Sequence, residues 1–258
     1  MPLNKVQFIS VATNDYLHRW KVLVENVRYD MQNLDWTWVL ITDAVADATA
    51  FTKSLDLADR IEIRTILPFG FPLASMVRYP VIVDHCDAIG WICYIDADME
   101  IEDPQRLDAE IRSSVEVTVV RHPGFTRPRG ISPSLGLSHN IANLALRVTM
   151  GGLGAWETRP SSKAFVPRRL RKTYAQAAIF FGPAIQIREL STQCWSWTEH
   201  DLRSGLIAKW HDESYLNCWM SHNTHKVVGP EFCFFDFPWL SKITHPVVRA
   251  VDKSKLQI

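Results

Sequence analysis

An apolar strand that ends in two carboxylates limits most strongly what this chain can fold into. The run 91–95 (WICYI) has strand composition, and Asp96 and Asp98 follow it with Ala97 between them. Such a strand is buried on both faces of its sheet, so the two acids should emerge at the sheet edge where open α/β folds bind ligands. Two carboxylates at this spacing can hold one hard divalent cation, whose remaining positions accept water and phosphate oxygens. An ordinary turn is the alternative, because aspartate is common in turns.

Strands alternate with helices in the first hundred residues. We expect strands at 6–12, 36–43 and 60–67, with helical segments between them, before the strand at 91–95. Pro80, in the last of these helical segments, predicts a kink or a late helix start. This alternation predicts an α/β fold with a mostly parallel sheet. Further along the chain, we expect a strand at 115–120 and a helix at 184–201 that stops at Gly205.

The composition is that of a globular protein with no general affinity for nucleic acid. The 258 residues are 47% hydrophobic and 22% charged, which allows one large α/β domain or two small ones. Lys and Arg number 28, as do Asp and Glu, so any surface that binds anions must be local. Some of the 10 Trp are expected to line a binding surface and most to lie in the core.

The cysteines and the N-terminus indicate a cytoplasmic protein. Five scattered cysteines form no C-x-x-C pair, which is typical of a reduced protein: Cys86, Cys93, Cys194, Cys218 and Cys233. Residues 1–5 lack the pattern of a signal peptide, and no apolar run reaches the length of a transmembrane helix.

A second cluster of polar and ionisable residues lies at 210–214 (WHDES), directly after a short apolar stretch of sequence. Burying consecutive polar and ionisable side chains there would cost free energy unless they face a polar cleft. The alternative is a helix N-terminus with acidic residues in its first turn.

The composition changes between the acids at 96–98 and the cluster at 210–214. Residues 126–154 are rich in Pro, Gly, Ser and Asn around a helical island at 141–148, which is typical of an insertion or flap. The basic cluster at 168–172 is a solvated loop, or it meets phosphates or a membrane surface. The small side chains at 174–182 suit either a floor beneath a ligand or a tight contact between helix and strand. The aromatic residues at 232–239 are expected to be structural.

Several of these stretches, in the same order, resemble glycosyltransferase family 6, which includes the histo-blood-group A and B transferases and the α-1,3-galactosyltransferase. The matching stretches are 94–100 (YIDADME), 122–125 (HPGF), 157–161 (ETRPS) with 164–167 (AFVP), 177–180 (AAIF) and 210–217 (WHDESYLN). The resemblance implies a single GT-A-type domain, with a Rossmann-like nucleotide-binding half at 1–100 and an acceptor and catalytic half at 101–258. It also implies transfer of galactose or N-acetylgalactosamine from a UDP-sugar to a glycan hydroxyl, with retention of the α configuration.

The resemblance also implies roles for individual residues. Asp96 and Asp98 would hold Mn²⁺ or another divalent cation on the UDP diphosphate, and Glu213 would be the active-site glutamate. Acceptor binding would involve His122, Trp210 and Glu213. Donor binding would involve Val11, Ala12, Thr13, Tyr16, Arg78, Asp96, Ala97, Asp98, Gln176, Ala177, Ala178, His211 and Asp212. Retention needs either a carboxylate nucleophile, for which Glu213 is the only matched candidate, or attack from the same face, in which Glu213 would orient the acceptor and stabilise charge.

The sequence also departs from the family pattern. The segment between Phe125 and Glu157 is longer than in the animal enzymes, and Phe181 stands where the family usually has glycine. Both Asp of the acidic motif are kept, which predicts metal dependence. Ala178 in place of glycine narrows the room for an N-acetyl group and favours galactose. The candidates for a basic tail that closes over UDP are Lys242, Arg249, Lys253 and Lys255.

The sequence therefore predicts an unanchored, cytoplasmic transferase of a bacterium or of a virus-infected bacterial host. Its partners would be a UDP-sugar and a glycan or lipid-linked glycan. Peripheral contact with a membrane is a further option. One alternative is a UDP-sugar-binding protein with weak or lost transferase activity, for which crowding of the sugar pocket by Phe181 would be the motive. An inverting transferase or a sugar-nucleotide pyrophosphorylase shares the acidic strand end but gives no account of residues 210–214.

Overall fold

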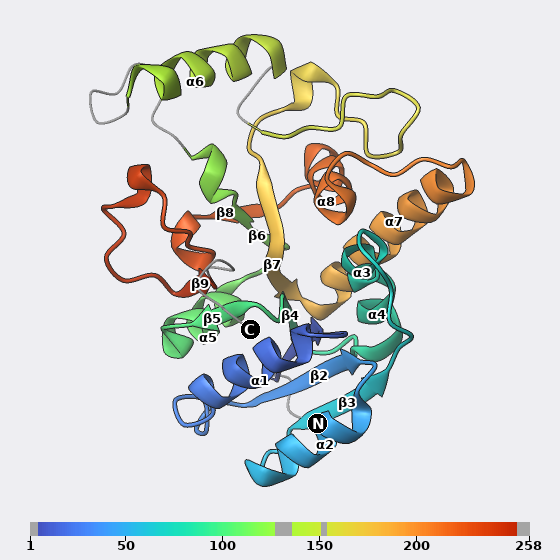
Figure 1. Ribbon diagram of the computed structural model, residues 1–258, viewed down its shortest axis with the longest axis vertical. Coiled ribbons are helices and arrows are strands. Elements are labelled where there is room, and N and C mark those ends of the chain that lie inside the picture. The colour runs from blue at the N-terminus through green and yellow to red at the C-terminus, as the bar shows by residue number, and fades with distance from the viewer. Residues whose placement is uncertain (1–4, 127–135, 151–153, 252–258) are drawn as a thin grey trace.

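A central seven-stranded sheet organises the chain (Figure 1). The computed structural model describes residues 5–126, 136–150 and 154–251. The strands run in the order β3-β2-β1-β4-β7-β6-β8. Their bounds are β1 Val6–Val11, β2 Trp36–Thr42, β3 Ile61–Thr65, β4 Trp91–Ile95, β6 Thr118–Arg121, β7 Ala175–Pro183 and β8 Lys226–Val228. A separate two-stranded ribbon pairs β5 (Met99–Ile101) with β9 (Val248–Ala250).

The strand directions bring distant segments to one edge of the sheet. β1, β2, β3 and β4 are mutually parallel, whereas β7 runs antiparallel to both β4 and β6. The carboxyl ends of β1 and β4 therefore meet the amino end of β7. Parallel pairs predominate in this sheet, which confirms the predicted α/β class and is consistent with a GT-A-type fold.

Helices cover both faces of the sheet. The helices are α1 Tyr16–Val27, α2 Val45–Ser54, α3 Leu73–Met76, α4 Arg78–His85, α5 Pro104–Ser113, α6 Leu137–Met150, α7 Ala184–Arg203 and α8 His211–His222. One core cluster joins α1, α2 and α5 to the sheet, and another joins α4, α7 and α8 to its opposite face. Phe8 belongs to the first cluster and Ile9 to the second, as strand alternation requires.

The structure confirms one predicted boundary and corrects another. The helical stretch before β4 is divided into α3 and α4, and Pro80 lies in the first turn of α4, where the backbone N–H groups have no partner within the helix. This confirms the late start. The strand expected at 115–120 begins only at Thr118, because Val115 is 82% exposed in the turn after α5.

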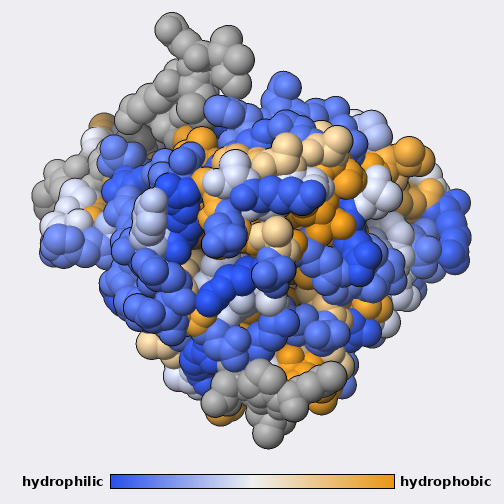
Figure 2. All heavy atoms as spheres, turned by 90° about the horizontal axis from the view of Figure 1, so that it is seen from below, coloured by the Kyte–Doolittle hydropathy of each residue, from blue (hydrophilic) through white to orange (hydrophobic). Residues whose placement is uncertain are grey.

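The remaining structure bears on the other expectations. α6 confirms the helical island of the expected insertion, most of whose other residues lie outside the described ranges. Within the described ranges, no helix has both the length and the apolar character that a membrane span requires. All five cysteines are buried as free thiols. On the face that Figure 2 shows, apolar side chains are interspersed with hydrophilic ones, as on most globular surfaces.

Candidate active site

A cleft of about 390 Å³ lies at the edge where β1 and β4 end. Seven predicted donor-side residues line it: Val11, Thr13, Tyr16, Arg78, Asp96, Ala97 and Asp98. Ala12 does not, because its side chain is fully buried in the core behind β1. The lining also includes residues that the sequence did not single out: Asn14, Asp15, Phe69, Gly70, Phe71, Ala74, Ser75 and Tyr94.

The turn after β1 forms one wall of the cleft. Asn14 has a left-handed backbone (φ 54°), which asparagine tolerates better than most residues. Its N–H donates to Asp43 Oδ1 at 3.0 Å, which ties this turn to the end of β2. Tyr16 is 40% exposed at the start of α1. An aromatic face is therefore presented to the cleft on a fixed turn.

Arg78 links the two acidic centres. Its Nη2 lies 3.2 Å from Asp96 Oδ1, and its Nε lies 3.2 Å from Asp212 Oδ2. The guanidinium also donates to the carbonyl of Ala177 and lies over the ring of Tyr94. Burial alone would lower the pKa of Arg78, but Asp212 and Asp96 raise it above its usual range. One buried cation thus holds the end of β4 beside the start of α8.

Asp96 is fixed at the base of the cleft. Its N–H donates to the carbonyl of Ala178 at 2.8 Å, and its Oδ1 accepts from the Tyr94 hydroxyl at 2.7 Å. Burial raises the pKa of Asp96 to about 6, although Arg78 opposes the shift. The backbone carbonyl of Asp98 accepts from Val251 at 3.0 Å, so the C-terminal end of β9 supports the turn that carries both acids.

The two carboxylates fit a divalent cation that phosphate oxygens complete. Among the described residues, no three His, Cys, Asp or Glu side chains form a metal-binding group. Asp96 and Asp98 nevertheless both line the cleft, and they offer only oxygen ligands. Magnesium-like cations are commonly held by one or two carboxylates together with water and substrate phosphates. The donor set therefore suits a cation that arrives with a diphosphate.

Glu213 lies in the first turn of α8, directly after Asp212. Its carboxyl group lies near the Tyr174 hydroxyl and the Ala177 backbone, which both act to lower its pKa, and its side chain is 17% exposed. Burial, followed by the neighbouring Asp212, raises the pKa of Glu213 to about 8. The carboxyl group therefore holds its proton to a higher pH than an exposed glutamate does. Residues 210–214 are thus both a helix N-terminus and part of a polar site.

His122 faces Glu213 as a neutral imidazole. Its Nδ1 accepts from the Gly124 N–H at 3.0 Å, which assigns the ring proton to Nε2. Nε2 lies 4.0 Å from Glu213 Oε2, and burial lowers the pKa of His122 to about 4. Rings of Phe125 and Tyr174 pack against it. A polar hydrogen is therefore directed toward Glu213 from the end of β6.

The start of β7 lies between Arg78 and Glu213. Gln176 is 9% exposed and accepts from the thiol of Cys233, while Ala177 contacts both Arg78 and Glu213 through its backbone. Ala178 is nearly buried. Phe181 is fully buried, packs against Phe232, and does not line the cleft described above. The expectation was that Phe181 crowds the sugar pocket, but its side chain points into the core.

The residues flanking Asp212 are more exposed. His211 has a left-handed backbone (φ 44°), and its ring packs edge-on against Phe71 at 4.6 Å between centroids. Trp210 is 49% exposed, and its backbone N–H donates to Ser214 Oγ at 2.9 Å. Phe71 and His211 therefore connect the loop before α3 to the start of α8.

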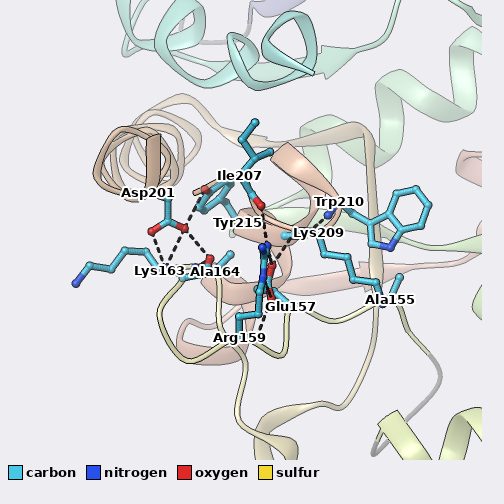
Figure 3. A network of polar contacts seen from close by, with 12 residues as sticks. Ala155, Glu157, Arg159, Lys163, Ala164, Asp201, Ile207, Lys209, Trp210 and Tyr215 are labelled. Carbon is cyan, nitrogen blue, oxygen red and sulfur yellow. Dashed lines mark hydrogen bonds and ion pairs between the residues drawn. The ribbon is translucent and has the colours of Figure 1, made fainter. Parts of the chain in front are cut away.

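A polar network built on the buried carboxylates of Glu157 and Asp201 holds the start of α8 in place (Figure 3). Glu157 accepts from the Arg159 side chain and from the Lys209 N–H, and Arg159 also donates to the Ile207 carbonyl. Burial alone would raise the pKa of Glu157, but its hydrogen bonds hold it at about 2. Asp201 at the end of α7 accepts from Ser162 at 2.6 Å, from Lys163 N–H and from the Tyr215 hydroxyl. The stretch 157–161 therefore positions α8 from outside the cleft.

Of the candidate tail residues, the described ones do not reach the cleft lining. Arg249 pairs with Glu102 and lies over Phe234, and Lys242 is exposed. Lys253 and Lys255 lie outside the described residues.

Comparisons with known proteins agree with the motifs. Residues 153–256 match the sequence model of glycosyltransferase family 6. The rat histo-blood group ABO system transferase 2 is 29% identical over 145 residues, which cover 56% of this chain and 36% of that protein. The rat ABO system transferase 1 is 30% identical over 138 residues, covering 53% and 32%. Human alpha-1,3-galactosyltransferase 2 is 43% identical over 63 residues, covering 24% and 18%.

The matched region of this chain spans only about a third of the length of the two rat proteins. The agreement includes the region that carries β7 and α8, where Glu213 lies. The predicted resemblance to the family 6 glycosyltransferases is confirmed.

Proposed function

We propose that the chain transfers galactose or N-acetylgalactosamine from a UDP-sugar to a glycan hydroxyl, in α linkage with retention, with a divalent cation such as Mn²⁺. One observation carries this proposal: Arg78 holds Asp96 and Asp212 on either side of a single guanidinium. The acids that would face a diphosphate and the helix that carries Glu213 therefore belong to one site. The family resemblance supports the reaction class.

The first half of the chain would hold the nucleotide. All lining residues of the cleft lie between Val11 and Asp98, and its volume of about 390 Å³ suits a small-molecule site. Val11, Thr13 and Tyr16 would receive the uridine, and Arg78 and the two acids the diphosphate. A bound cation would supply Lewis-acid stabilisation of the departing diphosphate charge.

The second half would hold the sugar and the acceptor. Gln176, Ala177 and Ala178 lie at the start of β7 between the cleft and Glu213, which supports a role beside the donor sugar. His211 and Asp212, at the start of α8, would contact the donor sugar. His122 would bind the acceptor through its Nε2–H, and the exposed face of Trp210 would stack on an acceptor sugar.

Glu213 would act in one of two states. Its neutral form can donate a hydrogen bond that orients the acceptor hydroxyl in a same-face attack. Its ionised form can attack the anomeric carbon or stabilise positive charge there. A pKa of about 8 keeps both forms accessible near neutral pH. The buried thiols support action in a reducing compartment such as the cytosol.

The test is Mn²⁺-dependent binding of UDP by calorimetry, followed by a screen of UDP-sugars for slow hydrolysis and for the anomer of the product. D96A should abolish Mn²⁺-dependent UDP binding, whereas the matched change D84A, at an exposed aspartate of α4, should leave it intact. Unchanged affinity in D96A would refute the donor site. UDP binding without hydrolysis or transfer for any UDP-sugar would instead favour a binding protein that has lost activity.

A further inference from the structure

α6 exposes an apolar stripe. Leu137, Ile141 and Leu144 recur at the i, i+4, i+7 spacing of one helix face and are 78%, 59% and 64% exposed. None of the three belongs to a core cluster among the described residues. Large apolar side chains gathered on one exposed helix face indicate a surface that is covered in use.

The sequence around this helix is strongly basic, although the whole chain has no net charge. Between residues 117 and 187 the only acid is Glu157, which is buried against Arg159. The same segment contains ten cationic residues: Arg121, Arg127, Arg129, Arg147, Arg159, Lys163, Arg168, Arg169, Arg171 and Lys172. Their excess is therefore local and lies on either side of α6 in the chain.

Part of this charge lies at the same end of the molecule as α6. Arg168 and Arg169 form a 3₁₀ turn with Leu170, and Lys172 follows it; all three cations are exposed. In Figure 1, this yellow turn and the yellow-green α6 both lie at the top of the long axis. The turn after His122 also lies on the side of the body toward α6.

We propose that α6 and the basic turn 168–172 form a docking face for an anionic lipid bilayer. The apolar stripe would enter the boundary between headgroups and acyl chains, and the cations would pair with lipid phosphates, as in other interfacial amphipathic helices. Charge favours this occupant over a second copy of the chain, because two copies that met at this face would bring their cations together. Docking here would turn the candidate acceptor side, at His122, toward the membrane.

The experiment is co-sedimentation of the full chain with vesicles of phosphatidylcholine, with and without an equal part of phosphatidylglycerol. The wild-type chain should bind the anionic vesicles, and the bound fraction should fall as salt rises. The triple variant R168Q/R169Q/K172Q should bind about a hundredfold more weakly, since each cation near an anionic surface contributes roughly a factor of five. The triple variant L137S/I141S/L144S should lose at least about tenfold, because its apolar insertion is gone.

A matched control distinguishes the stripe from apolar surface in general. I89S/V115S/I185S changes three exposed apolar side chains elsewhere and should bind vesicles like the wild type. Circular dichroism checks that each variant is folded. The proposal is overturned if the wild type binds both vesicle types equally or not at all, or if the stripe variant and the control behave alike. A second result would also overturn the proposal: the wild type forms a dimer and shows no preference between the vesicles, and L137S/I141S/L144S converts that dimer to a monomer. None of these outcomes depends on whether the chain transfers sugar.

Discussion

Replacement of Arg78 by methionine tests the central geometry of the site. Arg78 is 5% exposed and compensates two carboxylates, Asp96 and Asp212, each 3.2 Å away. Methionine keeps much of the side-chain volume but removes the charge and the hydrogen bonds to the carbonyls of Ser75 and Ala177. Removing one partner of a buried ion pair costs about 3–5 kcal/mol, because the remaining charge is left uncompensated. We expect R78M to lose about that much free energy of unfolding at pH 8.

The loss should shrink as the pH falls. Burial already raises the pKa of Asp96 to about 6 against the opposing effect of Arg78, so without the cation its pKa should rise further. A carboxyl group whose pKa is higher in the folded than in the unfolded state binds more protons when folded, so it lowers stability as pH rises. R78M should therefore lie closer to the wild type at pH 5 than at pH 8.

Urea denaturation at both pH values measures the effect, and R78M/D96N/D212N provides the matched control. Neutral amides in place of both carboxylates should restore most of the lost stability at pH 8. R78K keeps the positive charge but cannot reproduce the planar fork that contacts both acids. Its free energy of unfolding should therefore lie between those of R78M and the wild type. A cost below about 1 kcal/mol for R78M, or a cost that does not change with pH, would show that Arg78 does not hold the two acids as the structure indicates.

Three further predictions concern α8 and its support. E213Q should keep UDP binding but lower transfer by about 10²–10⁴-fold, as loss of a positioned catalytic group does; an unchanged rate in a transfer assay removes Glu213 from the chemistry. If the ionised carboxylate is the active form, the transfer rate should rise with pH through about 8 in the wild type, and a pH–rate profile that is flat there would show that ionisation is not needed. D201N should lower the free energy of unfolding by about 2–3 kcal/mol, because Ser162, Lys163 and Tyr215 donate to this buried carboxylate; thermal unfolding measures it, and a loss no larger than that of the surface variant D84A would contradict the role of the network.

The sequence was sufficient to place Asp96 and Asp98 at the ligand edge of the sheet. A fully apolar strand must be buried on both faces, and the residues directly after its carboxyl end must then emerge at that edge. The family resemblance, not strand reasoning, pointed to Val11, Thr13 and Tyr16, which lie at the end of β1 and just after it. Because β1 pairs with β4 in parallel, these residues reach the same edge of the sheet as the two acids.

The other contacts depend on how distant elements pack, which local sequence patterns do not specify. Arg78 was matched by family resemblance, but its bridge from Asp96 to Asp212 requires α4 and α8 to meet at the end of the sheet. Phe181 was placed beside the sugar pocket from the family pattern alone, and which face of β7 packs against Phe232 depends on the tertiary structure. Tyr174 gave no sequence signal, since only the packing of β7 against α8 brings its hydroxyl to Glu213.

These contacts make the acids of the site one electrostatic unit. Asp212 pairs with Arg78 and raises the pKa of Glu213, while Arg78 lowers the pKa values of both Asp96 and Glu213. Groups coupled in this way titrate together, so an apparent pKa in a pH–rate profile belongs to the set and not to Glu213 alone. The neutralising variant D212N removes the negative neighbour, so it should lower the apparent pKa of the carboxyl group at 213, and a profile that keeps its wild-type midpoint in D212N would show that this coupling does not reach the reaction.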